Sequence, residues 1–158
     1  MCAKNKMDGQ MKRLSPDDIN AFFAAHFAQV APDYVIEAAG DMGARVRQRF
    51  SERRLRPGGT VSGPSMFELA DVAIYVAILA QMGVGEDPAQ AHLSRGALTV
   101  TTNLNINFLR KPEAVDLIAE ARLMKLGRRL AVGEVWLRSE GREEPVAHAT
   151  ATYSVPPA

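Results

Sequence analysis

The stretch that decides the fold is residues 57–82, PGGTVSGPSMFELADVAIYVAILAQM. It begins with a glycine-rich turn and continues as a segment whose strongly polar residues are Glu68, Asp71 and Gln81. A helix that is apolar on all sides has to be buried. We therefore predict a long central helix with Pro64 at its first position, where the missing N–H of proline costs nothing.

Asp71 is the residue of this stretch that points to chemistry. It falls two turns into the predicted helix, where a carboxylate without a partner is costly to bury. Two roles are open on the sequence: a structural carboxylate held by the amides of the glycine-rich loop, or a general base at the wall of a cleft. We predict the catalytic role, because acids with an unusual environment cluster at functional sites.

The composition indicates one globular domain. The chain has 158 residues, a formal net charge of +1 and a single cysteine, Cys2, which excludes an internal disulfide framework and any cysteine-rich metal site. The uncharged run of the central helix, residues 72–84, is shorter than the roughly 18 residues that a membrane span needs. We expect a disordered N-terminal tail over residues 1–13, and over residues 14–158 one cytoplasmic domain that binds neither nucleic acid nor membrane.

A first helix is predicted ahead of the central one. Ser15 is a typical N-cap, and Pro16 suits the first helical position. Apolar residues then recur at helical spacing as far as Val30, so that Pro32 is expected to end the helix. His26 lies on this apolar stripe, and we interpret it as a packing residue rather than a catalyst.

Alternating segments predict an antiparallel sheet. They are residues 34–38, 44–50, 98–108, 115–126, 130–137 and 145–155. Residues 40–43 form the turn of a hairpin between the first two. In the second strand Arg45, Arg47 and Arg49 share one face; a solvated face is the favoured interpretation and a phosphate-binding stripe the alternative. Helix, two strands, a buried helix and four strands define an α+β protein.

The strand at 98–108 has a second open question. Its alternation places Thr101 on a polar face together with Asn103, Asn105 and Asn107. This face either meets water or presents hydrogen-bond donors to a ligand, and the sequence leaves both open.

Four local motifs, in order along the chain, carry a resemblance to a known family. They are Gly59-Thr60-Val61-Ser62-Gly63-Pro64, then Leu69-Ala70-Asp71, then Ile106-Asn107-Phe108-Leu109-Arg110-Lys111-Pro112, and Gly127-Arg128-Arg129-Leu130-Ala131-Val132-Gly133-Glu134-Val135. With them the chain resembles the hotdog-fold acyl-CoA thioesterases of the phenylacetic-acid-degradation type. The resemblance implies a long central helix wrapped by a curved antiparallel sheet, here with an extra N-terminal helix.

The resemblance also implies a site shared by two subunits. In it the backbone N–H of Gly63 polarises the thioester carbonyl, and Asp71 acts as general base or nucleophile. Thr101 supplies a hydroxyl from the other subunit, and Arg110 and Lys111 bind the phosphates of coenzyme A. The implied substrate is an acyl-CoA, the implied assembly is a homodimer or homotetramer, and no cofactor or metal is needed.

The chain departs from the family pattern in the loop before the helix. Arg56 replaces an asparagine of the family motif, and Ser62 replaces a histidine. We expect Arg56 to lie beside the thioester carbonyl or beside Asp71. Ser62 either caps the helix, which is the commoner role of serine there, or orients Asp71.

These departures keep two other functions open. The first is a non-catalytic protein that binds acyl thioesters. The second is an acyl-thioester dehydratase, which resembles this chain in its central helix. A dehydratase of this kind pairs a histidine with the helix acid, and no histidine lies between His26 and His92, so this alternative is the weaker one.

Overall fold

The computed structural model describes residues 12–158; the tail expected at residues 1–13 lies outside this range except for its last two residues. The helices are α1 (Pro16–His26) and α2 (Gly63–Met82), with short 3-10 helices η1 (Ala31–Asp33), η2 (Glu52–Arg54) and η3 (Pro88–Leu93). The strands are β1 (Tyr34–Gly40), β2 (Gly43–Gln48), β3 (Val100–Phe108), β4 (Leu117–Leu126), β5 (Leu130–Ser139) and β6 (Pro145–Ser154). They form one antiparallel sheet in the order β1-β2-β4-β5-β6-β3.

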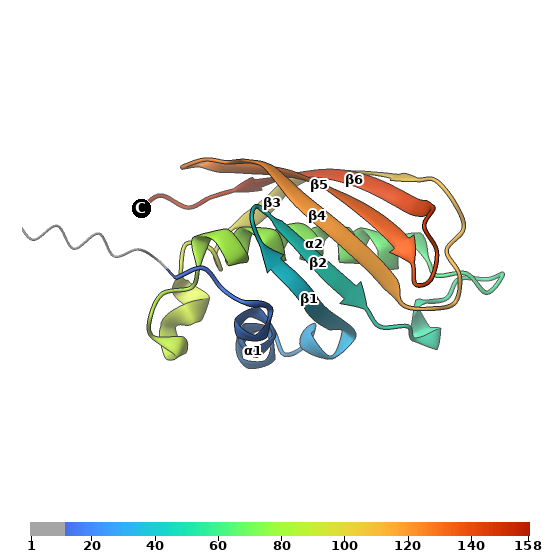
Figure 1. The fold of residues 1–158 in the computed structure, drawn as a ribbon, viewed down its shortest axis with the longest axis horizontal. Helices are drawn as coiled ribbons and strands as arrows, with labels where there is room; N and C mark the ends of the chain where they lie inside the picture. Colours follow the sequence, from blue (N-terminus) through green and yellow to red (C-terminus); the bar gives the residue numbers. More distant parts are fainter. Residues whose placement is uncertain (1–11) are drawn as a thin grey trace, which may run out of the picture.

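The sheet curves around α2, as Figure 1 shows, with α1 packed beside β1. The expected α+β hotdog architecture with an additional N-terminal helix is confirmed. The helix occupies the inner face because twelve of its twenty residues are buried, and such a helix cannot face water.

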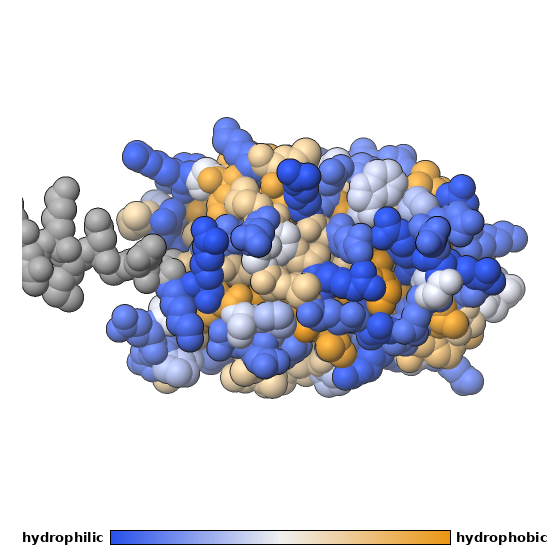
Figure 2. All heavy atoms as spheres, viewed as in Figure 1, coloured by the Kyte–Doolittle hydropathy of each residue, from blue (hydrophilic) through white to orange (hydrophobic). Residues whose placement is uncertain are grey.

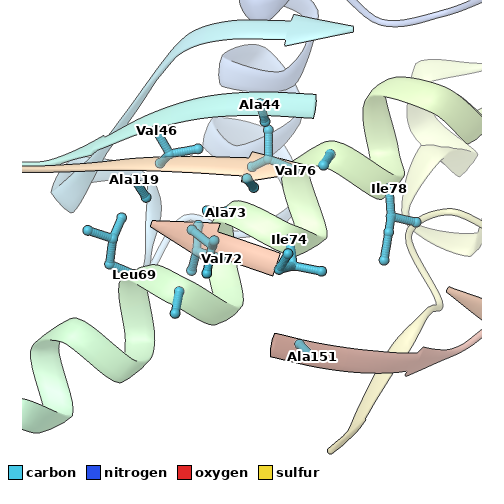
Figure 3. Packing of buried hydrophobic residues seen from close by; sticks show 14 of the residues in the cluster. Ala44, Val46, Leu69, Val72, Ala73, Ile74, Val76, Ile78, Ala119 and Ala151 are labelled. Atoms are coloured by element: carbon cyan, nitrogen blue, oxygen red, sulfur yellow. The ribbon is translucent and has the colours of Figure 1, made fainter. Parts of the chain in front are cut away.

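Small residues on the strands let α2 approach the sheet closely. In Figure 3 larger side chains of α2, among them Leu69 and Ile74, lie among strands whose labelled residues include Ala119 of β4 and Ala151 of β6. At Gly133 of β5 an added Cβ would lie 2.8 Å from Ile74 Cδ1 and 3.0 Å from the carbonyl oxygen of Arg122. A larger residue at position 133 would force the Ile74 side chain or the neighbouring strand to shift.

By length and composition alone, α2 is apolar enough to cross a membrane, although 67% of its most apolar window is buried inside the domain. The face in Figure 2 shows small hydrophobic patches separated by hydrophilic side chains. A core helix passes the same compositional test as a membrane span, and here its partners are the strands of the sheet.

The first helix is shorter than the sequence predicts. Ser15 caps α1 in a reciprocal capping box with Asp18, but the helix ends at His26 rather than before Pro32. Phe27 has φ −138° and takes the chain out of the helix. Val30 then packs on the core from the following turn, so its apolar spacing continues although the helix does not.

The β1–β2 hairpin matches its prediction. Asp41 and Met42 both have positive φ, 50° and 64°, as the two central residues of a type I′ turn require.

The arginines of β2 form ion pairs with acidic residues of or beside β4. Arg45 contacts Glu120, and Arg47 contacts Asp116. These arginines lie on a polar outer face, as the favoured interpretation held.

A bulge in β3 changes which face Thr101 occupies. Thr101 pairs with Tyr153 of β6, whereas Asn103 pairs with Thr152, so Thr102 is an extra residue in the strand. The bulge turns Thr101 to the inner face, and the placement predicted from simple alternation, on the asparagine face, is wrong. Bulges commonly re-aim a side chain in this way beside a functional site.

Candidate active site

Asp71 is held by two hydroxyl groups from the end of the sheet. Thr101 Oγ1 donates a hydrogen bond of 2.7 Å to Asp71 Oδ1. The hydroxyl of Tyr153 lies 2.5 Å from the same oxygen and 2.8 Å from the Asp71 carbonyl oxygen. Two neighbouring strands therefore fix the carboxylate of a helix that packs against both.

The two carboxylate oxygens of Asp71 are not equivalent. Oδ1 receives the two hydroxyl groups, while Oδ2 has no hydrogen-bond partner within residues 12–158. Asp71 is half-buried and lines a cavity. The unpaired Oδ2 can accept a proton from a water molecule or a substrate group, with its orientation fixed by the bonds to Oδ1.

Tyr153 is a functional residue that the sequence analysis missed. It is 2% exposed, and burial, with the neighbouring charge of Asp71, raises its pKa well above the ordinary tyrosine value. Its hydroxyl therefore stays protonated and remains a donor. A signal was present, because Ala147, Ala149 and Ala151 mark the inner face of β6 and Tyr153 continues their alternation.

The cavity beside Asp71 has a volume of about 570 Å³. Its polar end consists of Asp71, Thr101 and Tyr153. The opposite wall comes from the end of α1 and the turn after it, and from the face of α2 that looks toward them. The apolar and aromatic side chains of this wall are Phe22, His26, Phe27, Val30, Val72 and Tyr75.

A second carboxylate lies at the rim of this cavity. Glu68, one turn before Asp71, accepts a 2.6 Å hydrogen bond from the Tyr34 hydroxyl and lies 3.4 Å from Arg54. Arg54 is buried and also pairs with Asp33 at 3.1 Å. These contacts tie the first turns of α2 to the loop before it.

No cluster of three metal-ligating side chains occurs among the described residues.

The start of α2 forms a separate hollow of about 390 Å³. Gly63, Arg56, Arg110 and Lys111 line it, so the structure brings together the predicted oxyanion donor and the three predicted cationic residues. Within residues 12–158 the N–H of Gly63 has no acceptor. The ring of Phe108 covers this glycine, 3.3 Å from where a Cβ would lie.

Ser62 takes the first of its two predicted roles. Its side chain caps α2 by accepting a hydrogen bond from the N–H of Ser65 at 3.4 Å. Its hydroxyl also lies 3.2 Å from Ser65 Oγ. Ser62 makes no hydrogen bond with Asp71 among the described contacts. The hydroxyl groups that bond to Asp71 come from β3 and β6 instead.

The two groups of site residues stay apart within one chain. Asp71 lies eight positions after Gly63, which corresponds to about 12 Å along a helix axis, and the two line different hollows. Thr101 contacts the Asp71 of its own chain, whereas the resemblance implies a hydroxyl from the other subunit. Arg56 lines the hollow that contains Gly63 and not the cavity that contains Asp71, so it does not lie beside Asp71 within one chain.

The three histidines lie where packing explains them. His26 stacks on Phe22 and on His92, with centroid distances of 5.2 and 5.0 Å, and its Nε2 lies 3.0 Å from the carbonyl oxygen of Pro88. His148 stacks on Trp136 on the outer face of the sheet. His26 and His92 do line the cavity that contains Asp71, which the sequence did not indicate.

The fold and the paired hollows along its central helix define a hotdog-fold protein. The family model of the thioesterase superfamily matches residues 58–146, a range that includes α2, β3 and most of the sheet. The chain belongs to the thioesterase superfamily. In a search by sequence, no curated protein matches it.

Several solved structures share the fold. An inferred thioesterase from Silicibacter sp. TM1040 is 46% identical, with a TM-score of 0.79 over 95% of this chain and 97% of that one. An inferred thioesterase of Ralstonia eutropha JMP134, named as a phenylacetic acid degradation-related protein, is 27% identical with a TM-score of 0.67, covering 81% and 89%. The E. coli PaaI protein, from the phenylacetic acid degradation operon, is 20% identical with a TM-score of 0.71, covering 89% and 91%.

Proposed function

We propose that this protein is an acyl-CoA thioesterase in which Asp71 activates the attacking water. The observation that carries the proposal is the carboxylate held through Oδ1 by Thr101 and Tyr153, with Oδ2 open to a cavity. A positioned carboxylate with one unoccupied oxygen is the arrangement that general base catalysis requires. Membership of the thioesterase superfamily supports a thioester substrate.

The reaction needs a general base and a hydrogen-bond donor for the oxyanion at the same thioester carbonyl. Asp71 Oδ2 takes a proton from water as the water oxygen attacks the thioester carbon. The carbonyl oxygen gains negative charge, which a free N–H at a helix start stabilises; Gly63 provides such a group. The carbon–sulfur bond then breaks, and the proton held by Asp71 passes to the departing thiolate. The products are a carboxylic acid and coenzyme A.

A symmetric homodimer formed through β3 would unite these two groups. β3 is an edge strand, paired on one side by β6 within the described residues, and it exposes Val100 and Phe108. Antiparallel pairing of two copies of β3 places the Thr101 end of one copy beside the Phe108 end of the other. Asp71 of one subunit then meets Gly63 of its partner, which accounts for their separation in a single chain.

The cationic hollow suits the nucleotide end of coenzyme A. Arg56, Arg110 and Lys111 surround Gly63, and all three side chains are exposed. Phosphate groups bound there would direct the thioester toward the start of α2. Guanidinium and ammonium groups are the usual protein ligands of phosphates.

Release of free thiol from a panel of acyl-CoA substrates tests this function. We expect time-dependent release from at least one member of the panel, without added metal. Sedimentation at micromolar concentration should give a species of at least twice the 17.2 kDa chain mass. A monomer with full activity would remove the shared-site mechanism.

The separation of Asp71 from Gly63 also favours a second candidate, a protein that binds acyl thioesters without hydrolysing them. In that case the acyl-CoA panel would bind and release no thiol. Thiol release, measured alongside binding of the same acyl-CoA panel, distinguishes the two candidates.

A further inference from the structure

We infer that the cavity beside Asp71 receives the acyl group, and that the extra helix α1 makes this site select a bulky, uncharged, apolar acyl group. This inference rests on the proposed function, because it assigns the acyl end of the same thioester. The observation that carries it is the source of the cavity wall. Phe22, Phe27 and Val30 come from α1 and the turn after it, and together with Tyr75 of α2 they line the cavity that contains Asp71.

The hollow at Asp71 and the hollow at Gly63 have opposite chemistry. Among the described residues that line the cavity at Asp71 there is no lysine or arginine, and the carboxylates of Glu68 and Asp71 lie at its wall. The hollow at Gly63 has Arg56, Arg110 and Lys111 instead. An acyl-CoA has the same asymmetry, with phosphates at one end and the acyl group at the other. The structure therefore assigns the cavity at Asp71 to the acyl end.

The two carboxylates at the cavity wall disfavour the binding of an anionic acyl group. A second carboxylate on the substrate, as in succinyl-CoA, would lie close to Asp71 and Glu68, and like charges at short distance repel one another. The described wall contains no lysine or arginine to compensate, and its two histidines, His26 and His92, stack on each other. We expect dicarboxylic acyl-CoA substrates to be rejected.

The cavity at Asp71 is too large for a small acyl group to fill. A volume of about 570 Å³ lies within the range of sites that hold whole small-molecule ligands. An acetyl group would leave most of the wall without contact. Each methylene that becomes buried improves binding by about fourfold. Phe22, Phe27 and Tyr75 can contact either an aromatic ring or an aliphatic chain. The acyl groups to compare are therefore phenylacetyl, which is aromatic, and octanoyl, which is aliphatic.

The test fills the cavity from the α1 side. Val30→Phe places a larger side chain in a half-buried position of the wall, and Ala97→Leu does the same from the loop before β3. Ala28→Phe is the matched control, because Ala28 is exposed and is not among the described residues that line the cavity at Asp71. Folding of each variant is checked by thermal unfolding. If Val30→Phe fails to fold, Ala97→Leu provides the same comparison.

Binding is measured with non-hydrolysable thioether analogues of octanoyl-CoA and phenylacetyl-CoA, and with free coenzyme A. We expect at least one analogue to bind wild type about tenfold or more tightly than free coenzyme A. Val30→Phe or Ala97→Leu should abolish most of this difference, and Ala28→Phe should retain it. In thiol release, the ratio of octanoyl-CoA or phenylacetyl-CoA turnover to acetyl-CoA turnover should fall at least tenfold in the filled variants.

Analogues that bind no more tightly than free coenzyme A would overturn the inference, as would filled variants with the wild-type acyl preference. Succinyl-CoA as the best substrate would overturn it as well. Tight binding of an analogue without thiol release from any acyl-CoA would leave the acyl site standing and contradict the proposed hydrolysis. The two failures are therefore distinguishable.

Discussion

The hydroxyl of Tyr153 and the carboxylate of Asp71 are joined by a hydrogen bond of 2.5 Å between the last strand and the central helix. The bond occupies Oδ1 and leaves Oδ2 free, so the tyrosine determines which oxygen of the acid acts. Tyr153 is a positioning residue in this arrangement, because it acts through Asp71 rather than on the substrate.

Replacing Tyr153 by phenylalanine should lower kcat with a smaller effect on KM. The substitution removes one donor to a charged acceptor, which is worth about 1.5–3 kcal/mol, and a reduction of about tenfold or more in kcat is expected. Tyr75→Phe is the matched control, because the Tyr75 hydroxyl bonds to the carbonyl oxygen of Ala97 in the same cavity wall. Equal loss in both variants would show that Tyr153 has no special relation to Asp71.

Asp71→Asn should reduce turnover by on the order of 10²-fold or more, because the amide cannot take a proton from water. Its Oδ1 can still accept from Thr101 and Tyr153, so the folded state should persist. The measurement is thiol release with the best acyl-CoA, alongside circular dichroism. A stable variant with wild-type turnover would exclude Asp71 as the base.

Gly63→Ala should reduce kcat/KM by between about tenfold and 10²-fold, the range expected when reacting groups are displaced slightly. The new Cβ would lie 3.3 Å from the Phe108 ring, so the ring must shift over the helix start. Stability should not fall, since alanine favours a helix more than glycine does. If the ring is the cause, adding Phe108→Leu should restore part of the activity; an additive second loss would contradict this explanation.

Arg56→Asn should leave folding unchanged and alter turnover through substrate binding. Arg56 is exposed, so we expect a rise of about two- to fivefold in the KM for acyl-CoA, the range of an exposed charge pair. The dependence of KM on salt should weaken as well. Arg129→Asn, at an exposed turn far along the chain, serves as control. Identical kinetics for wild type and Arg56→Asn would show that this arginine faces solvent throughout the reaction.

The protein should lose stability in alkali through its tyrosines. Burial raises the pKa of Tyr75 to about 12 from an ordinary value of 10.0, and it also raises the pKa of Tyr34 and of Tyr153. A raised pKa in the folded state means that the neutral form is favoured by folding. This contribution is fully present below pH 10 and is lost as pH rises through the folded values.

Two measurements check the sign of this effect. The native protein should show little tyrosinate absorbance between pH 10 and pH 11, and its free energy of unfolding in urea should fall with pH above about 10. Tyr153→Phe should reduce that slope. Native tyrosines that titrate near pH 10 would contradict the burial that the structure shows.

The main architecture could be predicted because its signals are local. Residues 63–82 have too few polar positions for an exposed helix, and the hairpin turn at Asp41 and Met42 has a composition that permits positive φ. The strands alternate over eight or more residues in most of the sheet. Each of these patterns follows from the chain's own periodicity.

The candidate site could be predicted only in part, because its contacts depend on pairing between distant segments. Asp71 stood out by its polarity in an apolar helix. Simple alternation places Thr101 on the wrong face, since a bulge in β3 cannot be recognised from alternation alone. The aromatic wall of the cavity depends on the angle at which Phe27 leaves α1, which no local sequence pattern indicates.

Because of the bulge at Thr102, the number of residues in β3 helps to decide whether a threonine hydroxyl can reach the helix acid. Loss of this single codon would remove the bulge and still leave Thr101 opposite Tyr153 on the inner face, whereas regular pairing of the unshortened strand would direct the Thr101 hydroxyl away from Asp71. Conversely, a homologue could keep a threonine in the aligned column and still lack the hydrogen bond to the acid. Comparison of relatives should therefore count residues between β3 and the helix acid before it compares their identities.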